Sequence, residues 1–386
     1  MKLIIFGLSV TSTWGNGHGT TYRALLRALH ERRHEITFFE KDVEWYSSNR
    51  DLPRPDFCDV QLYENWGSVL PRVRRMLKDA DVALVGSYFP DGVAALNEVF
   101  EARTPVKAFY DIDTPITITE LREHGRAEYL QAGQIPQLDL YFSFTGGPML
   151  HELESRFGAT RAVPLYCSFD PHVYHRFPVN EKFACDLSYM GTYAPDRQPK
   201  LQELLCEPAK QLPQRSFLVA GPQYPDTLAW PKNVKHIPHL SPAWHPQFYS
   251  SSRFTLNVTR RDMSMAGYSP SVRLFEAAAC GATIISDNWV GLETFFIPGE
   301  EILLPTGSLD VARYLTELTD AEVQRIGSCA QARVMAQHTN AHRAEEFERE
   351  IESCLSGVNV APRLSPFSSP AVSEGVHSFS SSSDPE

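Results

Sequence analysis

The sequence offers little cysteine chemistry and no long apolar segment. Its 386 residues include seven cysteines, an odd number, and none of them are spaced as Cys-x-x-Cys. Such scattered cysteines predict neither a disulfide framework nor a zinc knuckle, and they suit a reducing compartment. No apolar run approaches the roughly 18 residues that a membrane-spanning helix requires. We therefore expect a cytoplasmic protein with no integral membrane segment.

Positive charge is also scarce. Lys and Arg number 36 against 47 Asp and Glu, which gives a formal net charge of -11. This balance argues against a general nucleic-acid binder, although it is compatible with a local basic cleft. The chain is longer than a domain with a single hydrophobic core usually is, so two domains are expected.

The first half of the chain alternates apolar strand-like runs with helical patterns. Parallel strands joined by crossover helices build a doubly wound sheet, so this half predicts a Rossmann-like domain. We expect its strands at 2–8, 35–39, 59–63, 81–86, 106–110, 138–144 and 162–165, and its helices at 20–30, 69–78, 91–102, 119–129 and 148–156.

The second half repeats this alternation and predicts a smaller Rossmann-like domain. We expect its strands at 186–190, 216–220, 234–237, 254–258, 283–286 and 301–304, and its helices at 199–212, 309–318, 320–337 and 341–355. The predicted fold class is therefore α/β, with two Rossmann-like domains facing a cleft. The expected divisions are an N-terminal domain at 1–168, a linker at 169–184, a C-terminal domain at 185–340, a helix at 341–355 that can pack back on the first domain, and a disordered Ser/Pro-rich tail at 356–386.

Residues 267–281 predict a short helix with signals at both ends. Ser269 is a suitable N-cap, Pro270 suits the first helical position, and Gly281 can adopt the left-handed conformation that ends a helix. Residues here line the expected cleft.

Arg273 and Glu276 are three residues apart and share one face near the start of this helix. Exposed amides and the helix dipole favour an anion there, so the pair suits a ligand with both phosphate and hydroxyl groups, such as a nucleotide. The alternative is an ordinary surface ion pair.

A glycine-rich loop follows the first strand. In open α/β sheets ligands bind beyond the carboxyl ends of the strands. Glycines allow close backbone approach, so Gly15, Asn16 and Gly17 suit an acceptor-binding or phosphate-binding loop, of which we assign acceptor binding. His18 suits a base or a hydrogen-bond donor. A flexible loop with an exposed histidine is the alternative.

Two carboxylates, Asp111 and Asp113, directly follow the strand at 106–110. They could orient sugar hydroxyls or act as a base, with Asx-turn capping as the alternative. No nearby His or third carboxylate completes an oxygen cage, so no metal is expected. The second domain is expected to contribute further binding residues to the same cleft. They are Gly191, Thr192, Arg197, Arg260 and Ser269, and the two arginines suit the binding of a diphosphate.

Three stretches carry a resemblance to a known family. They are Arg-His-Glu-Ile-Thr-Phe-Phe at 33–39, Phe-Tyr-Asp-Ile-Asp-Thr-Pro at 109–115, and Ser-Pro-Ser-Val-Arg-Leu-Phe-Glu-Ala-Ala-Ala-Cys-Gly at 269–281. With these stretches the chain resembles the GT-B glycosyltransferases, particularly the family-4-like branch that contains the spore-maturation CgeB-type proteins. The likeness extends to about residue 355.

The resemblance implies a hexosyltransferase-type enzyme that uses a nucleotide-sugar co-substrate, with a UDP-sugar favoured, a hydroxyl-bearing acceptor and no metal or other cofactor. It also implies that the domain at 1–168 binds the acceptor and the domain at 185–340 binds the nucleotide sugar. By position, Glu276 would bind the ribose, Arg273 and Arg197 the diphosphate, and the main chain near His239 the base. Tyr268 stands where the family pattern has a second glutamate, which leaves retention or inversion of configuration open.

Two other functions fit parts of the sequence. An NAD-dependent oxidoreductase would use Glu40, about 20 residues beyond the glycine loop, to bind ribose, but Gly15-x-Gly17-x-Gly19 departs from the GxGxxG pattern. A non-catalytic sugar-binding protein could have kept the same fold. The sequence identifies neither the sugar, the base, the acceptor nor the oligomeric state.

Overall fold

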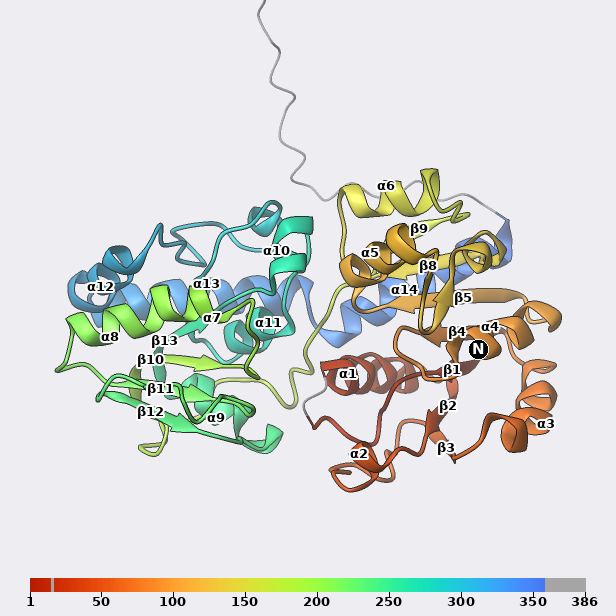
Figure 1. Ribbon diagram of the computed structural model, residues 1–386, viewed down its shortest axis with the longest axis horizontal. Coiled ribbons are helices and arrows are strands. Elements are labelled where there is room, and N and C mark those ends of the chain that lie inside the picture. Colours follow the sequence, from red (N-terminus) through yellow and green to blue (C-terminus); the bar gives the residue numbers. More distant parts are fainter. Residues whose placement is uncertain (15–16, 358–386) are drawn as a thin grey trace, which may run out of the picture.

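Two parallel α/β units lie side by side in the computed structural model, which describes residues 1–14 and 17–357 (Figure 1). The first unit is built on a seven-stranded sheet with the order β3-β2-β1-β4-β5-β8-β9, in which every neighbouring pair is parallel. Its strands are β1 (Lys2–Phe6), β2 (Glu35–Lys41), β3 (Asp59–Tyr63), β4 (Val82–Gly86), β5 (Val106–Asp111), β8 (Leu140–Ser143) and β9 (Ala162–Pro164).

Helices cover both faces of this sheet because its central strands are apolar on both sides. In β1, Leu3 and Ile5 join one buried cluster, whereas Ile4 and Phe6 join the other. The helices are α1 (Gly17–Glu31), α2 (Glu44–Ser47), α3 (Trp66–Leu77), α4 (Gly92–Glu101), α5 (Thr114–His124) and α6 (Pro148–Ser155), with a small antiparallel hairpin of β6 (Arg126–Ala127) and β7 (Leu130–Gln131).

The second unit is built on a five-stranded parallel sheet with the order β12-β11-β10-β13-β14. Its strands are β10 (Cys185–Met190), β11 (Phe217–Ala220), β12 (Val234–Ile237), β13 (Ser252–Asn257) and β14 (Thr283–Ser286). Its helices are α7 (Gln198–Leu201), α8 (Glu207–Gln211), α9 (His245–Ser250), α10 (Arg261–Ala266), α11 (Val272–Ala279), α12 (Ser308–Glu317) and α13 (Asp320–Gln337), with a π-helical turn between α7 and α8. The predicted α/β class with two Rossmann-like units is confirmed.

The last helix, α14 (Asn340–Ser356), packs on the first unit rather than the second. Its buried Phe347 stacks on Phe142 of β8 with ring centroids 5.2 Å apart. Glu350 accepts a hydrogen bond from Arg161, and Glu348 lies 2.6 Å from the ring of His34. The C-terminal helix therefore closes the chain back onto the unit in which it began.

Some predicted elements differ from the structure. Residues 301–304 form no strand and make only two isolated bridges, Leu303 to Ile285 and Ile302 to Pro298. The helix expected at 119–129 spans Thr114–His124 instead, and ends where Gly125 takes a left-handed conformation with φ 68°. The tail predicted at 356–386 lies outside the described residues from 358 onward. Within the described part of the chain, no helix has both the length and the apolar character needed to cross a bilayer.

Truncating Phe347 tests the packing of α14. Phe347→Ala removes a fully buried ring, so we expect a loss of about 3 to 5 kcal/mol in the free energy of unfolding, measured by urea denaturation followed by circular dichroism. The control is Leu355→Ala on the same helix, where the side chain is 48% exposed and the expected change is below about 0.5 kcal/mol. Equal effects of the two variants would contradict this account.

Candidate functional site

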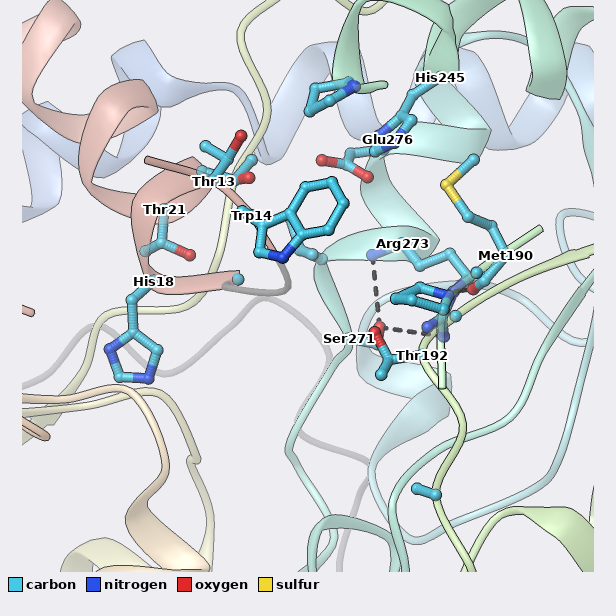
Figure 2. A pocket seen from close by; sticks show the side chains of 18 of the residues that line it. Thr13, Trp14, His18, Thr21, Met190, Thr192, His245, Ser271, Arg273 and Glu276 are labelled. Carbon is cyan, nitrogen blue, oxygen red and sulfur yellow. Dashed lines mark hydrogen bonds between the residues drawn. The ribbon is translucent and has the colours of Figure 1, made fainter. Parts of the chain in front are cut away.

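A cavity of about 770 Å³ lies between the two units, beyond the carboxyl ends of both sheets. The first unit lines it with the segment that enters α1, with α2 and the loop after it, and with the loops after β4 and β5. The second unit lines it with the loops after β10, β11 and β13 and with the start of α11. Figure 2 shows Trp14 between the two walls, with His18 on one side and Arg273 on the other.

His18 and Asp113 form a close pair on the wall of the first unit. His18 lies in the first turn of α1, Asp113 precedes α5, and the Nε2 and Oδ2 atoms are 2.7 Å apart. Burial would raise the pKa of Asp113, but the hydrogen bond and charge of His18, with the charge of Arg260, hold it below its usual value. Asp113 is therefore ionised at neutral pH.

Asp111 lies behind this pair and does not line the cavity. Its carboxylate is fully buried and accepts hydrogen bonds from the Tyr141 hydroxyl at 2.6 Å, the Thr117 hydroxyl at 2.8 Å and the Asp113 amide at 3.2 Å. Burial raises the pKa of Asp111 to about 7. The structure thus places Asp111 as a support for the loop that carries Asp113, and not at the surface where a substrate would bind.

The N-cap of α11 is Ser271 rather than Ser269. The Ser271 hydroxyl accepts a hydrogen bond from the Arg273 amide, whereas Ser269 and Pro270 precede the helix. The Ser269 hydroxyl instead lies 2.8 Å from the Thr145 hydroxyl of the first unit, so it joins the two walls of the cavity. The helix ends before Gly281, whose φ of 72° is the left-handed conformation expected from the sequence.

Arg273 is held in place by neutral groups. Its guanidinium donates to the side-chain oxygen of Asn257 at 2.8 Å and to the main-chain oxygen of Met190, and it lies over the Tyr189 ring, 5.4 Å from the centroid. Among the described residues no carboxylate lies within ion-pair distance of Arg273. Its charge is therefore not neutralised by the protein.

Two further arginines converge on this wall. Arg197 donates to the Thr192 main-chain oxygen at 2.6 Å, while its buried Nε has no hydrogen-bond partner in the described chain. Burial and the charges of Arg273 and Arg260 lower the pKa of Arg197. Arg260 is half exposed and lies 3.9 Å from Asp113. Within the described chain, Arg197 and Arg273 therefore have no carboxylate at ion-pair distance, whereas Arg260 lies near Asp113.

Glu276 lies one turn along α11 from Arg273 and is 5% exposed within the cavity wall. Burial raises its pKa to about 7, although a hydrogen bond from the Tyr174 hydroxyl and the charge of Arg273 act in the opposite direction. No ion pair joins Glu276 to Arg273 in the described structure. Its carboxylate is therefore available to accept hydrogen bonds from a ligand.

The remaining predicted residues also lie at the cavity, with two exceptions. Gly17, Gly191, Thr192 and His239 line it, whereas Gly15 and Asn16 lie outside the described residues. The His239 ring packs against Trp14 with centroids 4.0 Å apart.

The sequence analysis did not assign site roles to Tyr174 or Ser271. No sequence signal pointed to Tyr174, which lies in the segment predicted as the linker.

Tyr268 occupies the junction between the two units. Its ring lies against Gly147 and Gly291, where an added Cβ would come within 2.3 Å and 2.4 Å of the ring, respectively. Its amide donates to the Val290 oxygen at 2.7 Å, and its own oxygen accepts from the Gly146 amide at 2.9 Å. Tyr268 has a φ of 47°, which is uncommon for a residue with a side chain. Its side chain therefore packs between glycines and does not line the cavity.

Glu40 does not have the environment of a ribose-binding acid. It is fully buried and accepts hydrogen bonds from the amides of Val10 and Thr11, at 2.7 and 3.0 Å, and from the Ser9 hydroxyl at 3.0 Å. All of these donors belong to the loop after β1. Glu40 therefore holds that loop in place, and this removes the residue on which the oxidoreductase alternative rested.

Comparison with known proteins identifies the fold. Residues 197–349 match the family model described as glycosyl transferase-like. A search of the curated proteins found no match. Many solved structures are similar, including sucrose-phosphate synthase from Thermosynechococcus elongatus, with a TM-score of 0.66, 13% identity, and coverage of 92% of this chain and 99% of that chain.

Two other similar structures contain ligands. HepE of Anabaena in complex with UDP-glucose has a TM-score of 0.66 and 15% identity, with 92% of this chain and 100% of that chain covered. An alpha-glucosyltransferase in complex with UDP and a 13-mer DNA has a TM-score of 0.68 and 12% identity, with 91% of this chain and 99% of that chain covered. The chain therefore has the GT-B fold of these transferases.

Asp111→Asn tests the burial of the Asp111 carboxyl. Because its folded pKa of about 7 lies above an unfolded value of about 3.9, its contribution to stability is present below about pH 4 and is lost as pH rises through 7. We expect the stability of Asp111→Asn relative to wild type to increase by a few kcal/mol between pH 5 and pH 8, measured by chemical denaturation. Glu276 titrates equally in both proteins, so a constant difference would refute the assignment.

Proposed function

We propose that this protein transfers a sugar from a nucleotide-sugar donor, with a UDP-sugar favoured, to a hydroxyl group of an acceptor. The main observation behind the proposal is that one wall of the cavity carries arginines and the opposite wall carries a histidine–aspartate pair. Arg197 and Arg273 face it from the second unit without carboxylate partners, and the His18–Asp113 pair faces it from the first. The partial match to the glycosyl transferase-like model and the UDP in related structures support this reading.

The second unit would bind the donor. The guanidinium groups of Arg197, Arg260 and Arg273 would hold the diphosphate and stabilise the charge that develops as it departs. The N-terminus of α11 adds its dipole on the same side, and Glu276 would accept hydrogen bonds from the ribose hydroxyls. Since these cations come from the protein, the proposed transfer uses no metal ion. Gly191, Thr192 and main chain near His239 complete the proposed donor site.

The first unit would bind and activate the acceptor. His18 would take the proton of the attacking hydroxyl, and the ionised Asp113 would orient the imidazole and stabilise its positive form. The pair lies on the wall opposite Arg197 and Arg273. The reaction proposed on this basis is glycosyl transfer of the hexosyltransferase type.

Nucleotide binding can be measured directly by thermal shift. A nucleotide present at about 100 times its dissociation constant should stabilise the protein by about 2.7 kcal/mol. We expect UDP to raise the melting temperature of wild type more than GDP or dTDP, with the same shift in EDTA, and we expect Glu276→Ala to lose most of it.

The matched control is Glu317→Ala, an exposed glutamate at the end of α12 and away from the cavity, which should keep the full shift. A shift with NAD(H) alone, or no shift with any nucleotide, would refute the proposed donor site. Loss of the UDP shift in EDTA would refute metal independence.

The role of His18 can be separated from donor binding. His18→Ala should lower kcat for the release of UDP from UDP-glucose by about 10²- to 10⁴-fold, because it removes the proposed base, while the UDP thermal shift remains. His151→Ala, an exposed histidine on α6, should change neither quantity. Unchanged turnover in His18→Ala would contradict this role.

A further inference from the structure

The two walls of the cavity differ in charge. All three arginines that line it, Arg197, Arg260 and Arg273, belong to the second unit. Among the described residues that line it from the first unit, none is Arg or Lys, and the carboxylates are Asp51 and Asp113. The wall formed by the first unit, where the acceptor is proposed to bind, therefore has a net charge that is neutral or slightly negative.

Both carboxylates of this wall already have hydrogen-bonded partners in the described chain. Asp51 receives two hydrogen bonds from Arg23, at 2.7 and 2.9 Å, and the Arg23 side chain does not line the cavity. Asp113 is paired with His18. A phosphate or sulfate group on an acceptor would find no cation on this wall, and binding it there would cost desolvation without a compensating ion pair.

Aromatic side chains make up much of the same wall. Trp45 and Tyr46 of α2 line the cavity together with Trp14 and Tyr88. The Trp45 side chain is 55% exposed, which leaves a large apolar face open to a ligand. Rings of this kind combine an apolar face with a polar edge, and they suit ligands that present C–H faces and hydroxyl edges.

Tyr88 has a conformation that is typical of a functional site. It is one of four non-glycine residues with positive φ in the described chain, at 60°, a backbone conformation that is strained for a residue with a side chain. Its ring meets His18 edge-on, with centroids 5.6 Å apart, and packs on Tyr129 at 4.9 Å. Burial raises the pKa of Tyr88 to about 12, so the hydroxyl stays protonated and uncharged beside the proposed base.

We infer that the acceptor is an uncharged saccharide, which stacks on Trp45 and directs one hydroxyl toward His18. This inference rests on the proposed glycosyl transfer. In the reaction, the acceptor oxygen forms a bond to the anomeric carbon of the donor, the bond from that carbon to the diphosphate breaks, and the acceptor proton passes to His18. A nucleic-acid acceptor, as in the DNA complex of one related structure, would require phosphate contacts that this wall does not provide.

Binding to an immobilised glycan array tests the class of acceptor. The full chain, saturated with UDP, is applied to neutral, sulfated and phosphorylated glycans and to single- and double-stranded DNA. We expect retention on neutral glycans and at least tenfold weaker retention on the charged glycans and on DNA. Retention only on charged glycans or DNA, or on none of the surfaces, would overturn the inference.

Variants at two tryptophans locate the contact. Trp45→Ala should weaken glycan retention about tenfold and leave the UDP thermal shift unchanged, and Trp45→Phe should restore part of the binding. Trp244→Ala is the matched control, since Trp244 is 44% exposed and does not line the cavity. Equal losses in Trp45→Ala and Trp244→Ala would overturn the placement. Failure of the UDP shift itself would instead refute the proposed transferase function, so the two failures are distinguishable.

Discussion

The contact between residues 145–147 and residues 268–269 determines how the two halves of the cavity face one another. The Thr145 and Ser269 hydroxyls are 2.8 Å apart, and the Gly146 amide donates to the Tyr268 oxygen at 2.9 Å. These contacts join the loop after β8 to the segment that enters α11. Because both segments lie beyond the carboxyl ends of parallel strands, joining them brings the carboxyl edges of the two sheets together. The His18–Asp113 pair and the arginines belong to separate units, and this junction helps to bring them to one cavity, where Arg260 lies 3.9 Å from Asp113.

Several features of the cavity lower the stability of the folded protein. Three arginines lie near one another, Glu276 is buried, and Tyr88 has a strained backbone conformation. Neutral partners such as Asn257 and the Met190 carbonyl orient Arg273 without cancelling its charge. The large buried clusters on both faces of the two sheets offset such local costs. A ligand that carries negative charge and hydroxyl groups would relieve them.

Much of the fold followed from local patterns in the sequence. Residues 59–63, 234–237, 283–286 and 320–337 form strands or helices over the predicted ranges, because apolar runs and caps define them locally. Other outcomes depended on tertiary contacts. Both Ser269 and Ser271 are good caps by composition, but Thr145, distant in sequence, engages Ser269. Likewise, local spacing could not show that Asp113 faces the cavity while Asp111 faces Tyr141.

The packing of Tyr268 also limits how this protein can vary. Its ring fills the space that a side chain at position 147 or 291 would need, and both glycines have positive φ, at 61° and 90°. A larger residue at either glycine would be tolerated only after Tyr268 had become smaller. Conversely, a small residue at position 268 would leave a gap between the two units. These three positions are thus expected to co-vary among descendants of this sequence, and the order in which their codons change should be constrained.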